Sequence, residues 1–188
     1  FMTASPASVR RDLTRNLVLT ALMAALTAIC SQIQIPLPMI PINLALFSVH
    51  LSGALLGWKY GALSMIVYAL LGVIGVPVFA GFGSGPAVLF GKTGGYILGF
   101  VLSALVMALM QRLLPRRRVF TLLSMALGLL ACYAAGSVWF MQVYTQTKGA
   151  ISLGAVLSIC VVPYLIPDAI KIVLACLISE RLRAALHL

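Results

Sequence analysis

The chain has 188 residues, of which 62% are hydrophobic and only 9% are charged, and its mean hydropathy is +1.12. Soluble domains carry about 25% charged residues, so this composition excludes an ordinary soluble protein and predicts an all-α integral membrane protein. The net charge of +10 does not indicate a nucleic-acid-binding protein, because the arginines and lysines cluster at the ends of apolar runs.

Six apolar runs predict six transmembrane helices in a single membrane domain that covers residues 1–188. A chain of this length accommodates about six spans of roughly 20 residues each. We expect the helices at approximately residues 13–35, 42–57, 61–75, 94–113, 119–143 and 151–179. The segment from Leu56 to Tyr60 is expected to form a tight interfacial turn between the second and third helices, because Trp58 and Tyr60 are typical of an aromatic belt.

The basic residues predict which side of the plasma membrane each end of the chain occupies. With six spans and a cytoplasmic N-terminus, only Lys92 and Lys148 fall outside the cell. Ten basic residues then fall on the cytoplasmic side: Arg10, Arg11, Arg15, Lys59, Arg112, Arg116, Arg117, Arg118, Arg181 and Arg183. The positive-inside rule therefore predicts that both termini are cytoplasmic.

The stretch from Val76 to Phe100 is unusually rich in glycine, with seven glycines and two prolines, Pro77 and Pro86. Proline removes a backbone donor, and glycine lets the chain turn sharply, so we expect an extracytoplasmic loop between helices 3 and 4. Irregular backbone at membrane depth is tolerated where it is buried in protein or lines a cavity. A cavity is the functional interpretation, and a plain solvated loop is the alternative.

An acid and a lysine lie inside the last apolar run. Asp168 is one of only three acidic residues, and Lys171 follows three residues later, on the same face of a helix. A charge inside the membrane costs a few kcal/mol, so such a pair indicates a functional site, with a purely structural ion pair as the alternative. Pro163 and Pro167 interrupt the run, and a helix that restarts at Pro167 would place Asp168 in its first turn.

Other residues complete a candidate ligand site. Ser84 lies among the loop glycines, and Lys92 offers a second cation beside Lys171. Such a site would hold a ligand with one anionic end and one neutral polar end. Aromatic side chains that could form its walls are Phe82, Tyr96, Trp139 and Tyr164.

The first predicted helix carries a face of small residues. Ala21, Ala25 and Ala28, with Ala24 beside them, give small-xxx-small spacings that allow another helix to approach closely in lipid. Alanine is also simply a good helix former, and the pattern alone does not decide between the two.

The sequence predicts neither a metal site nor a cofactor. The cysteines lie singly inside apolar runs without CxxC spacing, and the chain has only two histidines. The four cysteines are Cys30, Cys132, Cys160 and Cys176.

Three segments together resemble the BioY family, the biotin-specific substrate-capture (S) components of energy-coupling-factor (ECF) transporters. They are GVPVFAGFGSGPAVLFGKTGGYILGF, IPLPMIPINLALFSVHLSGALLGWKYGAL before it and YLIPDAIKIVLA after it. The resemblance implies six helices and high-affinity biotin binding from the extracytoplasmic side. It also implies partnership with a transmembrane coupling (T) subunit and two ATPases, with Ala21, Ala25 and Ala28 contacting the T subunit.

The resemblance also assigns the site. It implies that Asp168 and Lys171 are the family's acid–lysine pair and that the polar residue of the loop lies near Gly83 and Ser84. Tyr96 and Trp139 match the tyrosine of its GGY motif and an aromatic residue of the fifth helix. We expect Lys171, with Lys92, to meet the carboxylate of biotin, and Asp168 and the Ser84 region to bind the ureido ring.

The chain departs from the family pattern at three places. Lys92 stands where the family commonly has proline, and Ile97 stands where some members have arginine. Pro167 directly precedes Asp168, whereas the family usually reads Pro-Gly-Asp.

Three other functions stay open at this stage. The chain could be an S component for another small vitamin, or a structural subunit that binds no ligand. A membrane-embedded enzyme that uses Asp168 as acid or base is disfavoured, because the sequence offers one buried acid, no metal cluster and no activated nucleophile. We therefore expect a transport protein that catalyses no reaction.

Overall fold

The computed structural model describes residues 6–37, 39–114 and 117–186, so Arg116 of the topology prediction lies outside the described residues. Helices dominate these ranges, as expected, and five helical stretches within them are long and apolar enough to cross a membrane: Asp12–Gln32, Ala45–Val73, Gly94–Leu113, Arg118–Lys148 and Leu153–Ala185. The elements are α1 Pro6–Gln32, β1 Gln34–Ile35, β2 Ile42–Asn43, α2 Ala45–Val73, η1 Ala80–Phe82, α3 Pro86–Leu89, α4 Gly94–Leu113, α5 Arg118–Lys148, α6 Leu153–Cys160, η2 Val162–Tyr164 and α7 Leu165–Leu186.

The second long element, α2, folds back on itself at Gly57. Gly57 has φ +69° and ψ −163°, a backbone conformation open chiefly to glycine. The hydroxyl oxygens of Ser52 and Ser64 lie 2.6 Å apart, whereas twelve residues of continuous helix would separate them by about 18 Å. The predicted turn between the second and third helices is therefore present, and the two halves of α2 pack against each other.

The first half of α2 is short and buried. From Ala45 to Leu56 it measures about 18 Å, less than the roughly 30 Å of a bilayer core. Val49 and Ala54 are among the core residues of this half. Within the described residues, the two halves of α2 and the other four long elements make six helices when counted separately, but only five stretches qualify as membrane spans, and their sidedness stays a prediction.

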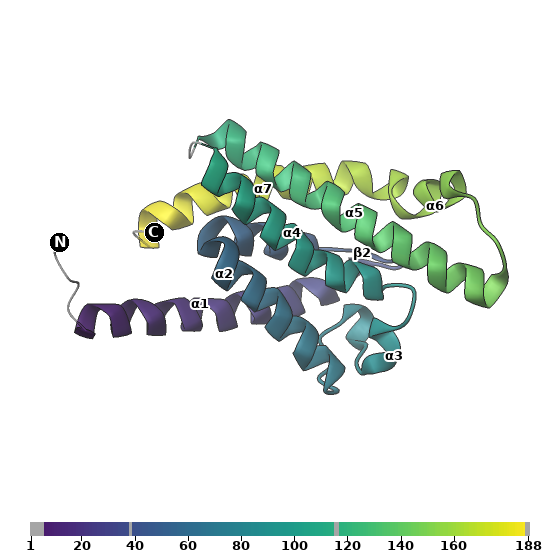
Figure 1. Ribbon diagram of the computed structural model, residues 1–188, viewed down its shortest axis with the longest axis horizontal. Helices are drawn as coiled ribbons and strands as arrows, with labels where there is room; N and C mark the ends of the chain where they lie inside the picture. The colour runs from purple at the N-terminus through teal and green to yellow at the C-terminus, as the bar shows by residue number, and fades with distance from the viewer. Residues whose placement is uncertain (1–5, 38, 115–116, 187–188) are drawn as a thin grey trace.

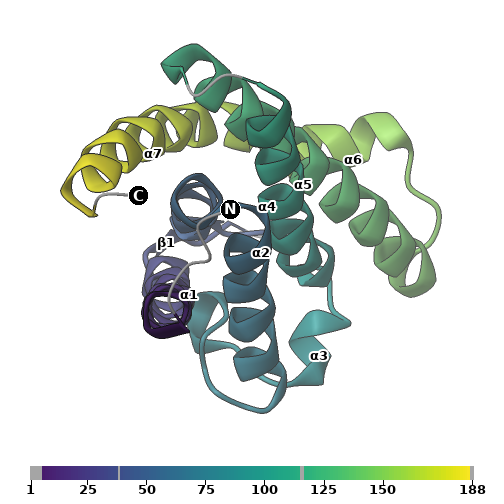
Figure 2. The same cartoon turned by 60° about the vertical axis from the view of Figure 1, so that its left-hand side comes forward.

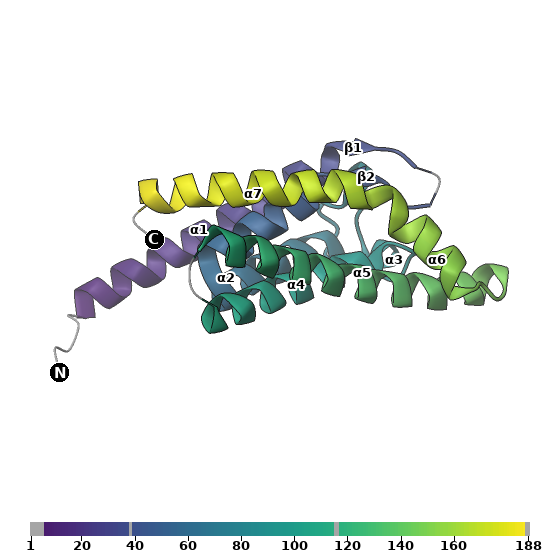
Figure 3. The same cartoon turned by 90° about the horizontal axis from the view of Figure 1, so that it is seen from above.

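α2 lies among α1, α4 and α7 (Figure 2). It packs between α1 and α4, and α5 lies against the far side of α4, while α7 closes the bundle against α2. Seen lengthwise, the start of α1, the end of α4, the start of α5 and the end of α7 share one end (Figures 1 and 3). The β1–β2 hairpin, α3 and α6 lie toward the other end.

Basic side chains make contacts between helices at the end that holds the start of α1 and the end of α7 (Figure 3). Arg118 pairs with Glu180 at 2.6 Å, and the Arg112 guanidinium lies 4.9 Å from the ring centroid of Trp58. The Nε of Arg183 donates to the carbonyl of Ala54, next to the Gly57 turn, at 3.1 Å. These contacts bring basic residues of three elements, α4, α5 and α7, to one end, in line with the expected cytoplasmic side.

The glycine-rich loop between α2 and α4 is irregular but anchored. The Phe79 ring is buried and lies directly over Gly72, where a Cβ would come within 2.0 Å of it. The Gln32 side chain, at the end of α1, donates to the carbonyls of Val78 and Phe79 at 3.2 and 3.0 Å. It also accepts from the amide of Phe82 at 2.9 Å. Gln32 thus satisfies loop backbone that would otherwise be unpaired in an apolar surrounding.

Candidate functional site

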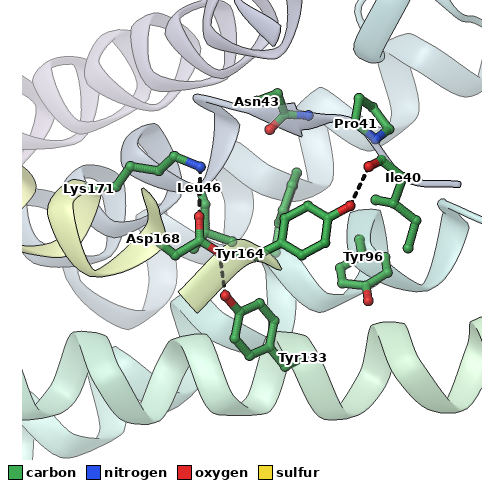
Figure 4. A pocket seen from close by; sticks show the side chains of 10 residues that line it. Ile40, Pro41, Asn43, Leu46, Tyr96, Tyr133, Tyr164, Asp168 and Lys171 are labelled. Carbon is green, nitrogen blue, oxygen red and sulfur yellow. Dashed lines mark hydrogen bonds and ion pairs between the residues drawn. The ribbon is translucent and has the colours of Figure 1, made fainter. Parts of the chain in front are cut away.

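A pocket lies where the chain leading into α2 meets α4, α5 and the start of α7. Figure 4 shows its side chains, which come from segments far apart in the sequence. It is lined by Ile40, Pro41, Asn43, Leu46, Tyr96, Phe100, Tyr133, Tyr164, Asp168 and Lys171. The predicted acid–lysine pair is therefore part of a cavity, together with the predicted Tyr96.

Asp168 lies between two donors (Figure 4). The Lys171 ammonium donates to Oδ1 at 2.6 Å, and the Tyr133 hydroxyl donates to Oδ2 at 2.5 Å. Asp168 and Lys171 are only 4% and 6% exposed. Each charge compensates the other, which is the condition under which an ion pair tolerates a membrane interior.

The local sequence explains why Asp168 lies at the start of a helix. Pro163 lies in the short 3-10 turn η2, between the end of α6 and the beginning of α7 at Leu165. The helix begins at Leu165, so Pro167 is its third residue and not its first, the position that the sequence predicts. Proline is tolerated there, because the first four N–H groups of a helix have no intrahelical acceptor. Asp168 still lies in the first turn, where the partial positive charge of the helix terminus favours a carboxylate.

The walls of the pocket are held by contacts between helices. The Tyr96 hydroxyl donates to the carbonyl of Cys160 at 3.2 Å, and its ring lies against Gly136 of α5. A Cβ at Gly136 would come within 2.4 Å of that ring. The Tyr164 hydroxyl donates to the carbonyl of Ile40, which ties η2 to the segment before β2 (Figure 4).

A second pocket adjoins the first and shares five lining residues with it, including Tyr96 and Phe100. Its further lining residues are Tyr68, Phe79, Ala80, Val88, Thr93 and Ile97. The second pocket is the larger one, about 130 Å³ against about 60 Å³. A polar end and a mainly apolar end therefore lie side by side.

The loop residues and the tryptophan predicted for the site do not line either pocket. Gly83, Ser84 and Lys92 are half-buried in the glycine-rich loop, whose Ala80, Val88 and Thr93 contribute to the second pocket instead. Trp139 donates its indole N–H to the carbonyl of Gly91 at 3.0 Å. Trp139 therefore fixes the loop from α5 instead of forming a wall.

Sequence reasoning did not assign Asn43, Tyr68 and Tyr133 to the site. Each is a polar group inside an apolar run, and this is the signal that could have found them. Tyr68 lies in a hydroxyl pair with Ser31 at 2.8 Å, whereas Tyr133 makes the second hydrogen bond to Asp168.

The alanines of α1 do not share one environment. Ala21 and Ala25 are exposed on the outer surface of the bundle, and Ala24 is 1% exposed within its core. Ala28 is half-buried and packs against that core. The Ala21–Ala25 pair is thus the part of the predicted contact face that a partner helix could reach.

No group of three or more His, Cys, Asp or Glu side chains that could hold a metal occurs in the described ranges. The four cysteines are all buried and unbridged.

The long apolar helices define a multi-pass membrane protein, and the buried acid–lysine pair gives it a polar site within the last of them. The family model described as BioY family matches residues 2–188, and the chain belongs to that family. The resemblance noted from the sequence is thereby confirmed.

Relatives match almost end to end. A probable biotin transporter BioY of Pyrococcus horikoshii is 38% identical over 90% of this chain and 96% of its own length. The biotin transporter BioY of Thermotoga maritima is 41% identical over the same shares. The crystal structure of the S-component for biotin from an ECF-type ABC transporter superposes with a TM-score of 0.83 and 26% identity, covering 98% of this chain and 95% of that one.

Proposed function

We propose that this chain is the S component of an ECF-type transporter and binds biotin with high affinity for uptake. The observation that carries the proposal is the neutralised Asp168–Lys171 pair in a pocket of a BioY-family chain. The chain acts as a binding and transport subunit, not as an enzyme. Biotin is its cargo, and the chain needs no cofactor of its own.

The ureido ring of biotin suits the acid–lysine pair. A ureido group is uncharged and carries two N–H donors and one carbonyl acceptor, so Asp168 accepts an N–H while Lys171 donates to the carbonyl. A carboxylate at Lys171 would lie close to Asp168, whose Oδ1 is 2.6 Å from the ammonium, and the two anions would repel each other. We therefore place the ring, rather than the carboxylate, at Lys171.

The remaining predicted residues keep indirect or peripheral roles in the proposal. Tyr96 separates the ring site from the second pocket, and Trp139 holds the glycine-rich loop at its border. Gly83 and Ser84 belong to that loop and stay candidate ligand contacts, whereas Lys92 lines neither pocket and is assigned no contact.

We propose that the end with the hairpin, α3 and α6 faces outward and that both termini are cytoplasmic. The arginine-rich end then lies on the side that the positive-inside rule requires. Energy for uptake comes from a T subunit and two ATPases, with which the S component assembles in the bilayer.

The test is biotin binding to the chain purified in detergent, by isothermal titration. Saturable binding near one biotin per chain, with no competition from other small vitamins, is the expected result. Binding of a different vitamin would reassign the substrate. A folded protein that binds no vitamin would overturn the proposal in favour of a structural subunit.

The exposed alanine pair of α1 gives a prediction about assembly. Replacing Ala21 and Ala25 with leucine is expected to abolish co-purification with the T subunit and ATPases, because the added bulk prevents close helix approach. Biotin affinity should stay within about twofold, since neither residue lines the pockets.

The matched control is Ala134→Leu, at an exposed position of α5 on another face. It adds the same bulk and should assemble normally. Normal assembly of the double α1 variant would place the partner interface elsewhere.

A further inference from the structure

We infer that this chain recognises its ligand by the ring alone and accepts uncharged tails, so that biotin amides and esters bind as well as the free acid. The inference rests on the proposed biotin function and concerns what the second pocket can hold. A ligand whose ring lies at Asp168 and Lys171 extends past Tyr96 and Phe100 into that pocket, because both side chains border both cavities.

The second pocket presents no charge to the tail. Among the described residues, every one that lines it is uncharged, and Phe79, Ile97 and Phe100 are buried apolar side chains. Its tyrosine hydroxyls already have partners: Tyr68 pairs with Ser31, and Tyr96 donates to a carbonyl.

The polar groups left over are neutral. Asn43 accepts from the amide of Ala45 at 3.1 Å, which leaves its NH₂ as a donor, and Thr93 adds a hydroxyl. Both are neutral donors that can hydrogen-bond the carbonyl of an amide or ester as well as a carboxylate, and neither supplies an ion pair that only the acid could use.

Neither Lys171 nor Lys92 brings a positive charge into the second pocket. Lys171 lines the first pocket, and its ammonium is paired with Asp168 at 2.6 Å. Lys92 precedes Thr93 but is not among the residues that line either pocket. A carboxylate gains its affinity from charge-assisted hydrogen bonds and loses affinity when it is desolvated without them. A neutral tail therefore gives up no ion pair, keeps both neutral donors, and avoids the cost of desolvating an anion.

The test is displacement of radiolabelled biotin from the detergent-purified chain by unlabelled biotin, biotin amide and biotin methyl ester. The three are expected to bind within about threefold of one another. An amide and ester that bind about tenfold or more weakly than the acid would overturn the inference. If radiolabelled biotin itself fails to bind, the proposed function fails instead, so the two failures are distinguishable.

Three variants test whether the tail meets a charge. Lys92→Gln should leave the ratio of acid to amide affinity unchanged, and a selective loss of acid binding would make Lys92 the carboxylate's partner and overturn the inference. Ile97→Arg places a cation in the second pocket and should create a preference for the acid of about tenfold or more. Ile97→Met, which keeps the pocket uncharged, should create none. The comparison of ligands on the unaltered chain stands even if the arginine variant fails to fold.

Discussion

Replacing Asp168 with asparagine is expected to weaken biotin binding at least about tenfold. The carboxylate accepts from Lys171 and Tyr133, and in the proposed complex it also accepts a ureido N–H. Asparagine keeps the size but presents one acceptor oxygen and an NH₂ group, which would face a donor. Isothermal titration measures the loss, and an unchanged affinity would contradict the assigned site.

The same substitution also disturbs the fold, so a control must separate the two effects. Without Asp168 the Lys171 ammonium is buried and unpaired, a change that typically costs about 3–5 kcal/mol. Asp168→Asn combined with Lys171→Gln removes both charges and should recover most of the lost thermal stability. Biotin affinity should stay at least about tenfold weaker in this double variant. Recovery of stability together with recovery of binding would make the pair a structural ion pair only.

Much of the architecture could be predicted, because the requirement for apolar helices in a membrane leaves long hydrophobic runs in the sequence. Membrane helices need extended apolar runs, and charges inside them are costly enough to mark a site. Asp168 and Lys171 were identified on that ground alone, and they do lie in a pocket. The clustering of arginines at the ends of these runs can likewise be read directly from the order of residues in the sequence.

What could not be predicted depends on contacts between distant segments. The hairpin pairs Gln34 with Asn43 and Ile35 with Ile42, although the apolar runs place these residues at the end of the first predicted helix and the start of the second. The fold-back of α2 was expected, but the burial of its first half was not visible in the apolar run. Trp139 is predicted for the site from its residue type and the family resemblance, but its hydrogen bond to the Gly91 carbonyl joins segments far apart in the chain and is not readable from the sequence.

The close contact between α4 and α5 at Gly95 should be disrupted by the addition of a single methyl group. At Gly95 a Cβ would lie 2.2 Å from the Cβ of Trp139 and 3.0 Å from the carbonyl oxygen of Ala135. Both atoms belong to the backbone or are fixed to it, so a rotamer change cannot relieve the overlap. Gly95→Ala must therefore separate the two helices.

Gly95→Ala is expected to lower the free energy of unfolding by about 2 kcal/mol, because overpacking of about 1–3 kcal/mol or more outweighs the better helix propensity of alanine. Thermal unfolding in detergent should detect a fall of several degrees. Biotin affinity should fall about tenfold as well, since the shift moves Tyr96 at the pocket and Trp139 at the loop together.

Gly154→Ala in α6 is the matched control, because nothing lies within 4 Å of a Cβ at that position. The same chemical change should there leave biotin affinity unaltered and the unfolding temperature equal or slightly higher. If Gly95→Ala behaves like Gly154→Ala, α4 and α5 are not in close contact at Trp139. The loop would then lack the support that α5 gives it, and the second pocket would lose its fixed border.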